Sequence, residues 1–314
     1  MQSIIPPIER TLLLNELNKD RFVRYSNNGH NEIYILTHHN APNTMQEIGR
    51  LREIAFRASG GGTGLATDID EFDIADAPYK QLIVWNPEDQ EIVGGYRYIK
   101  CKDAPVVNGI IQLATTELFS FSEQFIKEYV PSTVELGRSF VQPQYQPGIN
   151  NRKGLFSLDN LWDGLGAIIV DNSDVKHFYG KVTMYPDFNA KARDLIHYFM
   201  NLYFPDVDHL VRPIHPLYYK TDVSSFKGMF SGKDYKGDHT ILTRNVRSLG
   251  EHIPPLVNAY MNLSLTMKNF GTSLNDHFGA VEETGILVSI ADIYDTKKER
   301  HVSSYLKEKA LRKL

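Results

Sequence analysis

The segment Glu135-Leu136-Gly137-Arg138-Ser139-Phe140-Val141 constrains the fold of this chain more than any other. Apolar residues at positions 134, 136, 140 and 141 predict a β-strand over residues 133–141. Glu135 and Arg138 place two charges in this otherwise apolar strand. Because charges inside an apolar strand are costly unless they are paired or solvated, we expect the strand to face a cleft, a partner or a substrate.

Further charged residues precede this strand in a fixed order. Asp70-Glu71-Phe72-Asp73 comes first, and Gly94-Gly95-Tyr96-Arg97 ends another predicted strand. A structural role is the alternative to a functional one, with the aspartates capping a loop and Arg138 pairing with Glu135. The order and spacing of the whole set favour the functional interpretation.

Composition limits the class of protein. A chain of 314 residues that is 42% hydrophobic can bury one large core or two modest ones. The net charge of −4 argues against a general nucleic-acid binder. The charge is uneven, because Lys297–Leu314 carries +5 and residues 1–296 carry −9. This basic tail is either a solvated terminal helix or a surface for anionic lipid or an acidic carrier protein.

Cysteine content and hydropathy suggest the compartment. Cys101 is the only cysteine, so no intrachain disulfide is possible, which suits a reducing cytosol. No stretch approaches the ~20 apolar residues that a spanning helix needs, and residues 1–7 lack the features of a signal peptide. We expect a cytoplasmic protein, soluble or peripheral on the inner face of the membrane.

Local patterns predict alternating helices and strands, and therefore an α/β (α+β) fold in one unit rather than two domains. A loop-rich excursion is expected over residues 205–250, where prolines and polar residues cluster. The expected helices cover residues 9–20, 45–56, 120–129, 158–171, 190–203 and 255–267. The expected strands cover a hairpin within 21–37 and residues 81–85, 91–101, 133–141, 178–184 and 285–290.

Familiar nucleotide, metal and hydrolase motifs are missing from the sequence. Gly60–Gly64 follows a helix and lacks the third glycine of a dinucleotide fingerprint, which favours a mobile loop over a site. Gly228–Lys233 is one residue short of a P-loop and is followed by Asp234 instead of Ser or Thr. We find no zinc-spaced histidines and no serine-hydrolase elbow, so neither a metal site nor a nucleophilic serine is predicted.

The ordered charged set resembles the acyl-carrier-protein-dependent N-acyltransferases of the GNAT superfamily. Arg52 with Phe56 is similar to the R-x-x-x-F of a family helix, and the segments around Asp70, Arg97 and Glu135 are similar to its D-x-x-D, G-x-Y-R and E-x-x-R segments. Residues 253–260 and 275–279 resemble the branch that starts ornithine- and glycine-lipid synthesis, often labelled hemolysin-like. The acyl-homoserine-lactone synthases are a related branch. Together the matches span residues 45–290.

The resemblance implies a GNAT-like acyltransferase fold, with a mixed central sheet that is splayed at the Glu135 strand and flanked by helices. It also implies a division of the chain. Residues 1–44 would form an N-terminal helix and hairpin extension, residues 45–290 the N-acyltransferase domain, and residues 291–314 the basic tail.

The implied activity is transfer of a long-chain acyl group, with or without a 3-hydroxyl, from acyl carrier protein to the amine of an amino acid. The acceptor would be glycine or ornithine, and the product an aminolipid precursor. Glu135 is the candidate base, and Arg138 would orient it or bind the acceptor carboxylate. Backbone N–H groups from Ser139 to Val141 would stabilise the oxyanion. The acceptor site would be shaped by Arg52, Phe56, Asp70, Asp73 and Arg97.

The sequence departs from the wider superfamily after the Glu135 strand, where the usual Q/R-x-x-G-x-G/A loop is not found. Arg152, Lys153 and Gly154 would instead hold the phosphopantetheine of the carrier, so no tightly bound cofactor is expected. An acidic carrier protein would dock on Arg152, Lys153, Lys181 and the tail. Phe119, Phe121 and Phe125 would line an acyl tunnel or simply pack in the core.

Two other functions remain open at this stage. One is a signal synthase of the acyl-homoserine-lactone type, which acts on an S-adenosylmethionine-like acceptor; the additional segment 205–290 argues against it. The other is a non-catalytic lipid-binding protein, for which Glu135 would be dispensable. The complete charged set favours the enzyme.

Overall fold

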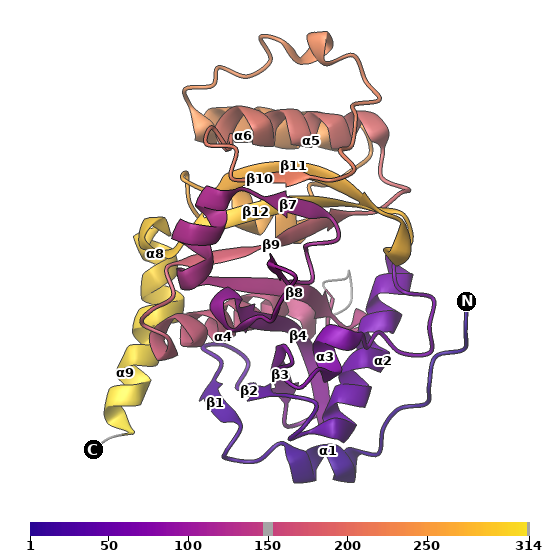
Figure 1. Ribbon diagram of the computed structural model, residues 1–314, viewed down its shortest axis with the longest axis vertical. Coiled ribbons are helices and arrows are strands. Elements are labelled where there is room, and N and C mark those ends of the chain that lie inside the picture. Colours follow the sequence, from indigo (N-terminus) through magenta and orange to yellow (C-terminus); the bar gives the residue numbers. More distant parts are fainter. Residues whose placement is uncertain (147–152, 313–314) are drawn as a thin grey trace. The chain divides into compact units, whose positions relative to one another are not determined.

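A computed structural model of the chain describes residues 1–146 and 153–312 (Figure 1). The chain forms two compact units, each built from stretches that are separate in sequence. The first unit comprises residues 1–114, 132–176 and 294–314, and the second comprises residues 115–131 and 177–293. The predicted boundaries after residues 44 and 290 stay predictions.

Within the described residues, the main sheet of the first unit has five strands in the order β1-β2-β3-β4-β8, and each neighbouring pair is antiparallel. The expected hairpin and the strands near residues 81–85, 91–101 and 133–141 are therefore confirmed. A two-residue turn at Asn108-Gly109 joins a small separate hairpin, β5 and β6. The strands are β1 (Phe22–Tyr25), β2 (Glu32–Leu36), β3 (Lys80–Asn86), β4 (Glu91–Lys100), β5 (Val106–Val107), β6 (Ile110–Ile111) and β8 (Thr133–Val141).

Helices cover both faces of this sheet. The helices are α1 (Arg10–Glu16), α2 (Pro42–Ala58), α3 (Glu71–Ile74), α4 (Ser157–Asp171), α8 (Asp295–Lys298) and α9 (Ser304–Leu311). Leu82 of β3 lies against α4, where a Cβ on Gly164 would come within 2.6 Å of its side chain. The adjacent residue, Gln81, bonds to Arg52 of α2. Because side chains alternate along a strand, α4 and α2 lie on opposite faces.

A β-bulge interrupts strand β8. Gly95 pairs with Phe140 and Arg97 pairs with Gly137, so two residues of β8, Arg138 and Ser139, stand opposite the single residue Tyr96. Arg138 has a φ of 47°, a left-handed conformation that glycine adopts easily and a branched or long side chain does not. The bulge therefore holds strain at one of the two charged residues that the sequence singled out.

The second unit contains three antiparallel strands in the order β9-β12-β11 and a small antiparallel pair, β7 and β10. Its longest helices are α5 and α6, which pack together, and α5 also packs on β11. The elements are β7 (Phe119–Phe121), β9 (His177–Met184), β10 (Val211–Pro213), β11 (Lys268–Asn275), β12 (Val281–Ser289), α5 (Ala190–Tyr203), α6 (Tyr235–Ser248) and α7 (Pro255–Met261).

Three of the expected elements in this unit are right only in part. The stretch expected to be a helix from residue 120 begins with strand β7, and its helical part is a π-helical turn over Phe125–Tyr129. Helix α7 ends at Met261, and residues 268–275 form β11. The excursion at 205–250 contains the 14-residue helix α6, which begins where the Asp234 side chain accepts a hydrogen bond from the Gly237 amide.

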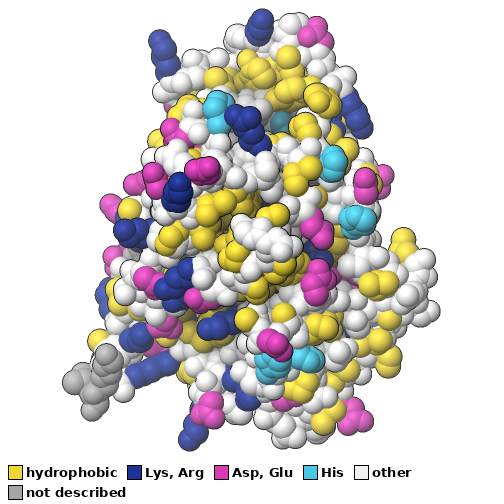
Figure 2. Space-filling view, viewed as in Figure 1, with side chains coloured by type: hydrophobic (Ala, Val, Ile, Leu, Met, Phe, Trp, Pro, Cys, Tyr) yellow, Lys and Arg dark blue, Asp and Glu magenta, His cyan; other side chains and the backbone are white. Residues whose placement is uncertain are grey.

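The basic tail is helical and belongs to the first unit, where α9 packs on α4 (Figure 1). Tyr305 is buried, whereas Leu306 and Leu311 are exposed. Basic side chains of the tail lie beside acidic partners, and Figure 2 shows the same mixture of blue and magenta side chains on the visible face. The tail's ion pairs are Lys298–Asp295, Arg300–Asp159, Lys307–Glu299, Lys309–Asp171 and Arg312–Glu308.

Within the described part of the chain, no helix is both long and apolar enough to cross a membrane.

Candidate active site

A row of polar side chains crosses the α2 face of the first unit's sheet. Gln81 of β3 stands opposite Arg97 of β4, and Arg97 stands opposite Gly137 of β8. Directly opposed residues of antiparallel strands point to the same face, and so do residues two apart along one strand. Glu135 therefore faces the same side as Gln81 and Arg97, beneath helix α2.

Glu135 is a buried carboxyl group, with 1% of its surface exposed. Its Oε2 accepts a hydrogen bond from the hydroxyl of Tyr79, which precedes β3. The same hydroxyl oxygen accepts a bond of 2.9 Å from the amide of Ala114. Burial and the adjacent Glu135 carboxylate both raise the pKa of Tyr79, so this tyrosine keeps its proton and holds the carboxylate on the α2 face of the sheet.

Arg52, Asp73 and Gln81 form a fully buried cluster beside this pair. Arg52 lies on α2 and donates to Asp73 Oδ2 over 3.0 Å, and it also donates to the amide oxygen of Gln81. Gln81 in turn donates to Asp73 Oδ1 over 2.9 Å. Removing one partner would leave a buried charge uncompensated, so these three side chains have to act as a set.

Arg97 connects the buried cluster to Asp70. Its Nη1 lies 2.6 and 2.7 Å from the two carboxylate oxygens of Asp70 and 3.3 Å from Asp73 Oδ2. The guanidinium group also lies over the rings of Phe72 and Tyr79. Asp70 is the N-cap of α3 in a reciprocal capping box with Asp73, which explains why the D-x-x-D spacing brings both carboxylates to this arginine.

The bulge brings Arg138 to the same cluster. Residues 135 and 138 of a regular strand would point to opposite faces, but the extra residue at the bulge changes this alternation. Arg138 Nε lies 2.9 Å from Asp68 Oδ2, and its Nη2 lies 3.5 Å from Asp70 Oδ2. Arg138 thus shares Asp70 with Arg97, and 14% of its side chain remains exposed.

The pKa values of two aspartates of the cluster are shifted in opposite directions. Burial alone would raise the pKa of Asp73, but the guanidinium groups of Arg52 and Arg97 outweigh it and lower this pKa to about 2. Burial raises the pKa of Asp68 above its ordinary value, although the three nearby arginines oppose the rise. Perturbed carboxyl groups held among several arginines are typical of a functional site.

Most of the predicted site residues are brought together. The predicted acceptor-site residues Arg52, Asp70, Asp73 and Arg97 form one network with Arg138, and Phe56 follows Arg52 by one turn of α2 and is buried. Ser139 and Val141 flank buried Phe140 beside the bulge, and the oxyanion role of their N–H groups stays a prediction.

The predicted phosphopantetheine residues are described only in part. Arg152 lies outside the described residues, and so does the side chain of Lys153. Gly154 is buried, and a Cβ at this position would lie 2.4 Å from the carbonyl oxygen of Tyr145. A close backbone approach therefore requires glycine here, whether or not a phosphate binds.

Three members of the cluster were not identified from the sequence: Asp68, Tyr79 and Gln81. Asp68 precedes Asp70 by two residues, and this D-x-D spacing was the available signal. Tyr79 and Gln81 surround the start of β3, where a polar residue inside an apolar strand repeats the pattern that identified Glu135. Their partners lie far away in sequence, so only the fold shows the connection.

Two predictions about residues of the second unit need comment. Phe119 and Phe125 are buried, and Phe121 and Phe125 meet the ring of Tyr179 edge to face, which is ordinary core packing. Lys181 was expected on a docking surface, but its side chain is largely buried and forms an ion pair with Glu283. Lys181 therefore has a structural partner, and its docking role stays a prediction.

Comparison with known proteins agrees with this geometry. A family model described as an acetyltransferase (GNAT) domain matches residues 51–151, which include the arginine–aspartate cluster and β8. A curated glycine N(alpha)-acyltransferase of Phocaeicola vulgatus is 53% identical over 309 residues, covering 98% of this chain and 95% of the relative. The chain belongs to the GNAT superfamily of N-acyltransferases.

A second curated glycine N(alpha)-acyltransferase, from Bacteroides thetaiotaomicron, is 53% identical over 307 residues, or 98% of this chain and 91% of that protein. Among solved structures, a CoA-dependent acyl-homoserine lactone synthase with SAM and isopentyl-CoA covers 88% of this chain and 89% of its own, at 11% identity and a TM-score of 0.38. The GNAT acyltransferase family and the α/β fold class are confirmed. The splaying of the sheet at the Glu135 strand stays a prediction.

Proposed function

We propose that this N-acyltransferase transfers an acyl group from acyl carrier protein to the α-amine of glycine, with ornithine as the alternative acceptor. The observation that carries the proposal is the buried carboxylate of Glu135 on the same sheet face as the arginine–aspartate cluster. The curated relatives, which act on glycine by name, support the choice of acceptor.

The reaction needs a neutral amine and a polarised thioester. An α-amine is mostly protonated at neutral pH, so Glu135 accepts its proton, directly or through water. The amine nitrogen then attacks the thioester carbon, forming the new C–N bond. Collapse of the tetrahedral intermediate breaks the C–S bond. The proton that the nitrogen loses in forming the amide is taken up by the sulfur, which leaves as a thiol. The N–H groups from Ser139 to Val141 would hold the transient oxyanion.

Arg138 is the candidate for binding the acceptor carboxylate. It is the arginine of the cluster with the most exposed side chain, and planar guanidinium groups bind carboxylates through paired hydrogen bonds. Asp68 and Asp70 hold it in place from one side. Arg52, Asp73 and Arg97 lie deeper and act as positioning residues, because their charges are already compensated inside the cluster.

The identity of the donor rests on fewer observations. Arg152 and Lys153 would hold the phosphate of phosphopantetheine. A long-chain product, with or without a 3-hydroxyl, would enter aminolipid synthesis. Reaction of a soluble carrier with formation of an amphiphilic product suits a cytoplasmic enzyme with peripheral contact to the inner membrane face.

The tail is the proposed docking surface for the acidic carrier or for anionic lipid, but its ion pairs reduce the charge it presents. Deletion would be a poor test, because His301 of the tail region bonds to Asp163 of α4 over 2.7 Å. The double variant Lys297→Glu/Lys307→Glu keeps that contact. We expect KM for acyl carrier protein to rise several-fold with kcat unchanged, whereas Lys19→Glu, an exposed lysine of another segment, should leave KM unchanged. Equal KM values in all three proteins would contradict tail docking.

The deciding experiment supplies purified protein with a 3-hydroxyacyl carrier protein and a pool of amino acids, followed by mass spectrometry of new N-acyl species. A parallel reaction contains the corresponding acyl-CoA. We expect N-acylglycine from the carrier-bound donor. Product from acyl-CoA alone would overturn the donor assignment, and N-acylornithine would replace glycine as the acceptor. No product from folded protein with either donor would favour a non-catalytic lipid-binding role.

The signal-synthase alternative is tested in the same reaction. Adding S-adenosylmethionine to the amino-acid pool would give an acyl-homoserine lactone if that alternative were correct. We expect no lactone, because the curated relatives cover nearly the whole chain and act on glycine by name.

A further inference from the structure

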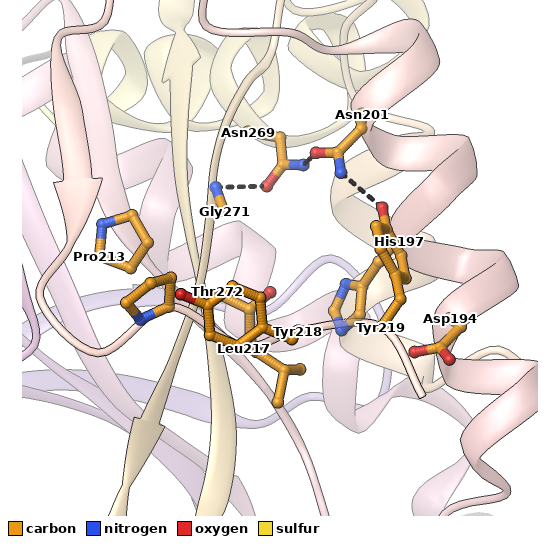
Figure 3. A pocket seen from close by; sticks show the side chains of 11 residues that line it. Asp194, His197, Asn201, Pro213, Leu217, Tyr218, Tyr219, Asn269, Gly271 and Thr272 are labelled. Carbon is orange, nitrogen blue, oxygen red and sulfur yellow. Dashed lines mark hydrogen bonds between the residues drawn. The ribbon is translucent and has the colours of Figure 1, made fainter. Parts of the chain in front are cut away.

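The second unit contains a pocket of about 130 Å³ that shares no residue with the charged cluster of the first unit. It is enclosed by one face of α5, by the segment 213–219 and by strand β11 (Figure 3). The lining residues are Asp194, His197, Asn201, Pro213, Pro216, Leu217, Tyr218, Tyr219, Asn269, Gly271 and Thr272.

Helix spacing and a second bulge build this pocket. Asp194, His197 and Asn201 follow one another at intervals of three and four residues, so they lie on one face of α5. In β11, Asn269 pairs with Ile286 and Thr272 pairs with Thr284, so the strand bulges at the residues between them. The bulge includes Gly271, whose φ is 84°, and it opens the strand beside α5.

His197 is the feature that points to a ligand. Only 6% of its surface is exposed, and its Nε2 is buried without a hydrogen-bond partner among the described residues. A buried polar atom without a partner costs roughly 1–3 kcal/mol, so such an atom in the wall of a pocket indicates that something else satisfies it. Figure 3 shows the imidazole among the side chains that line the pocket.

The charges at the pocket are already compensated. Asp194 Oδ1 accepts a hydrogen bond of 2.8 Å from Arg193 Nε. Its Oδ2 accepts hydrogen bonds of 2.9 and 2.7 Å from the backbone amides of Lys220 and Thr221. Burial lowers the pKa of His197 to about 4, with a smaller contribution from Arg193, so the imidazole is neutral at pH 7. Because His197 is neutral and both oxygens of Asp194 already accept hydrogen bonds, the pocket favours binding of neither a cationic nor an anionic ligand.

The pocket nevertheless offers a fixed hydrogen-bond donor. The hydroxyl oxygen of Tyr219 accepts a hydrogen bond of 2.8 Å from Asn201 Nδ2. Asn201 Oδ1 in turn accepts a hydrogen bond of 2.6 Å from Asn269 Nδ2. These two hydrogen bonds orient the side chain of Tyr219. The hydroxyl proton of Tyr219 has no acceptor among the described residues. Pro213, Pro216 and Leu217 add apolar walls around these polar groups.

We propose that this pocket binds a small uncharged ligand through a hydroxyl group that accepts from Tyr219 and bonds to His197. A hydroxyl both donates and accepts, so it satisfies the imidazole in either tautomer, whereas a carbonyl satisfies only one. The apolar walls suit aliphatic carbons next to the hydroxyl. The inference does not rest on the proposed function, because none of these residues belongs to the charged cluster.

The test uses the full chain with ¹⁵N-labelled histidine and follows the imidazole nitrogens of His197 by NMR. The His197→Phe spectrum assigns the signal. The probes are glycerol as a free polyol, ethyl 3-hydroxybutanoate as a hydroxyacyl group, ethyl butanoate as its deoxy analogue, and the 3-hydroxybutanoate anion. We expect the hydroxy ester, glycerol or both to shift the Nε2 signal in a saturable way. The probe that binds more tightly identifies the source of the hydroxyl. The deoxy ester should bind several-fold more weakly.

Tyr219→Phe keeps the ring and removes the donor, so we expect about 2–10-fold weaker binding of the hydroxyl probe, the worth of one hydrogen bond. Tyr198→Phe, on helix α5 next to His197 but packed on Phe226 and Phe230, is the control and should bind as the wild type does. The proposal is overturned if the deoxy ester or the anion binds as tightly as the hydroxy ester, if Tyr219→Phe binds normally, or if no probe shifts His197.

Discussion

Strands β8 and β11 each contain one bulge with a residue in the left-handed region, but the residue types differ. In β11 the position is Gly271, which adopts a φ of 84° without strain. In β8 it is Arg138, which adopts a φ of 47° at a cost of about 1 kcal/mol. Glycine lets β11 open beside α5, whereas β8 keeps a strained arginine because its guanidinium reaches Asp68 and Asp70. The comparison indicates that the β8 bulge is maintained for the charge it positions.

The largest expected effect is on catalytic turnover, and it distinguishes a catalytic role of Glu135 from a structural one. Glu135→Gln keeps the shape of the side chain and an acceptor for Tyr79, but it removes the base. We expect kcat to fall by about 10²–10⁴-fold. Tyr198→Phe in the second unit should keep wild-type activity. Steady-state acyl transfer measures both, and near-wild-type turnover of a folded Glu135→Gln protein would show that Glu135 is not the base.

The two units also contain comparable buried arginines. Arg52 pairs with Asp73, and Arg193 pairs with Asp194 and Glu282. We expect Arg52→Met and Arg193→Met each to lower the free energy of unfolding by roughly 3–5 kcal/mol, because each leaves buried carboxylates uncompensated. Lys127→Met breaks an exposed ion pair and should change it by less than about 1 kcal/mol. Urea unfolding is the measurement, and equal losses at Arg52 and Lys127 would contradict the buried network.

Acid should weaken the first unit through Asp73. Its folded pKa of about 2 lies below the unfolded value, so its ionised form stabilises the fold above the unfolded pKa, and this contribution is lost as pH falls toward 2. We expect the stability difference between wild type and Asp73→Asn to shrink by roughly 2 kcal/mol between pH 5 and pH 2. Using the difference removes the opposite contribution of Asp68, whose pKa is raised. A difference that does not depend on pH would show that Asp73 is not held ionised by its arginines.

The smallest expected effect is on the stability of variants at the two bulges, and it tests the backbone strain there. Gly271→Ala should be less stable than wild type by about 1 kcal/mol, because a Cβ there meets only Pro213 at 3.5 Å and the cost is backbone strain. For the same reason, Arg138→Gly should be more stable than Arg138→Ala by about 1 kcal/mol, since both variants lack the guanidinium. Thermal unfolding of the three variants gives both differences. Equal stability of the two Arg138 variants would remove the argument for strain.

The sequence predicted regular elements well where one periodicity dominated. Helix α5 and strand β8 have the predicted bounds, because each has a clear apolar pattern. Helix α6 has few apolar residues and was hidden by surrounding polar residues, although Asp234 and Gly237 mark its first turn. Strand β11 was not predicted, because it contains Asn269 and Gly271, which interrupt strand alternation.

The candidate site was predicted in its residues but not in its connections. Glu135 and Arg138 were expected to act together, and a regular strand would have kept them on opposite faces. The bulge that places Arg138 near Asp68 depends on the register of two strands, and local sequence does not determine that register. Tyr79 was missed because its importance arises only from its bond to Glu135 across the sheet.

The return of residues 294–314 to the first unit has a consequence for synthesis on the ribosome. Here α4 packs against a segment made more than 120 residues later, and Gly166 of α4 must lack a side chain because the carbonyl oxygen of His301 would lie 2.2 Å from its Cβ. A nascent chain therefore exposes one side of α4 until residues 294–314 have been made. Because residues 294–314 pack on α4 only late in synthesis, we expect slow folding and transient chaperone binding. A ribosome-stalled chain that ends before residue 294 should be captured by holdases more readily than one that includes residues 294–314.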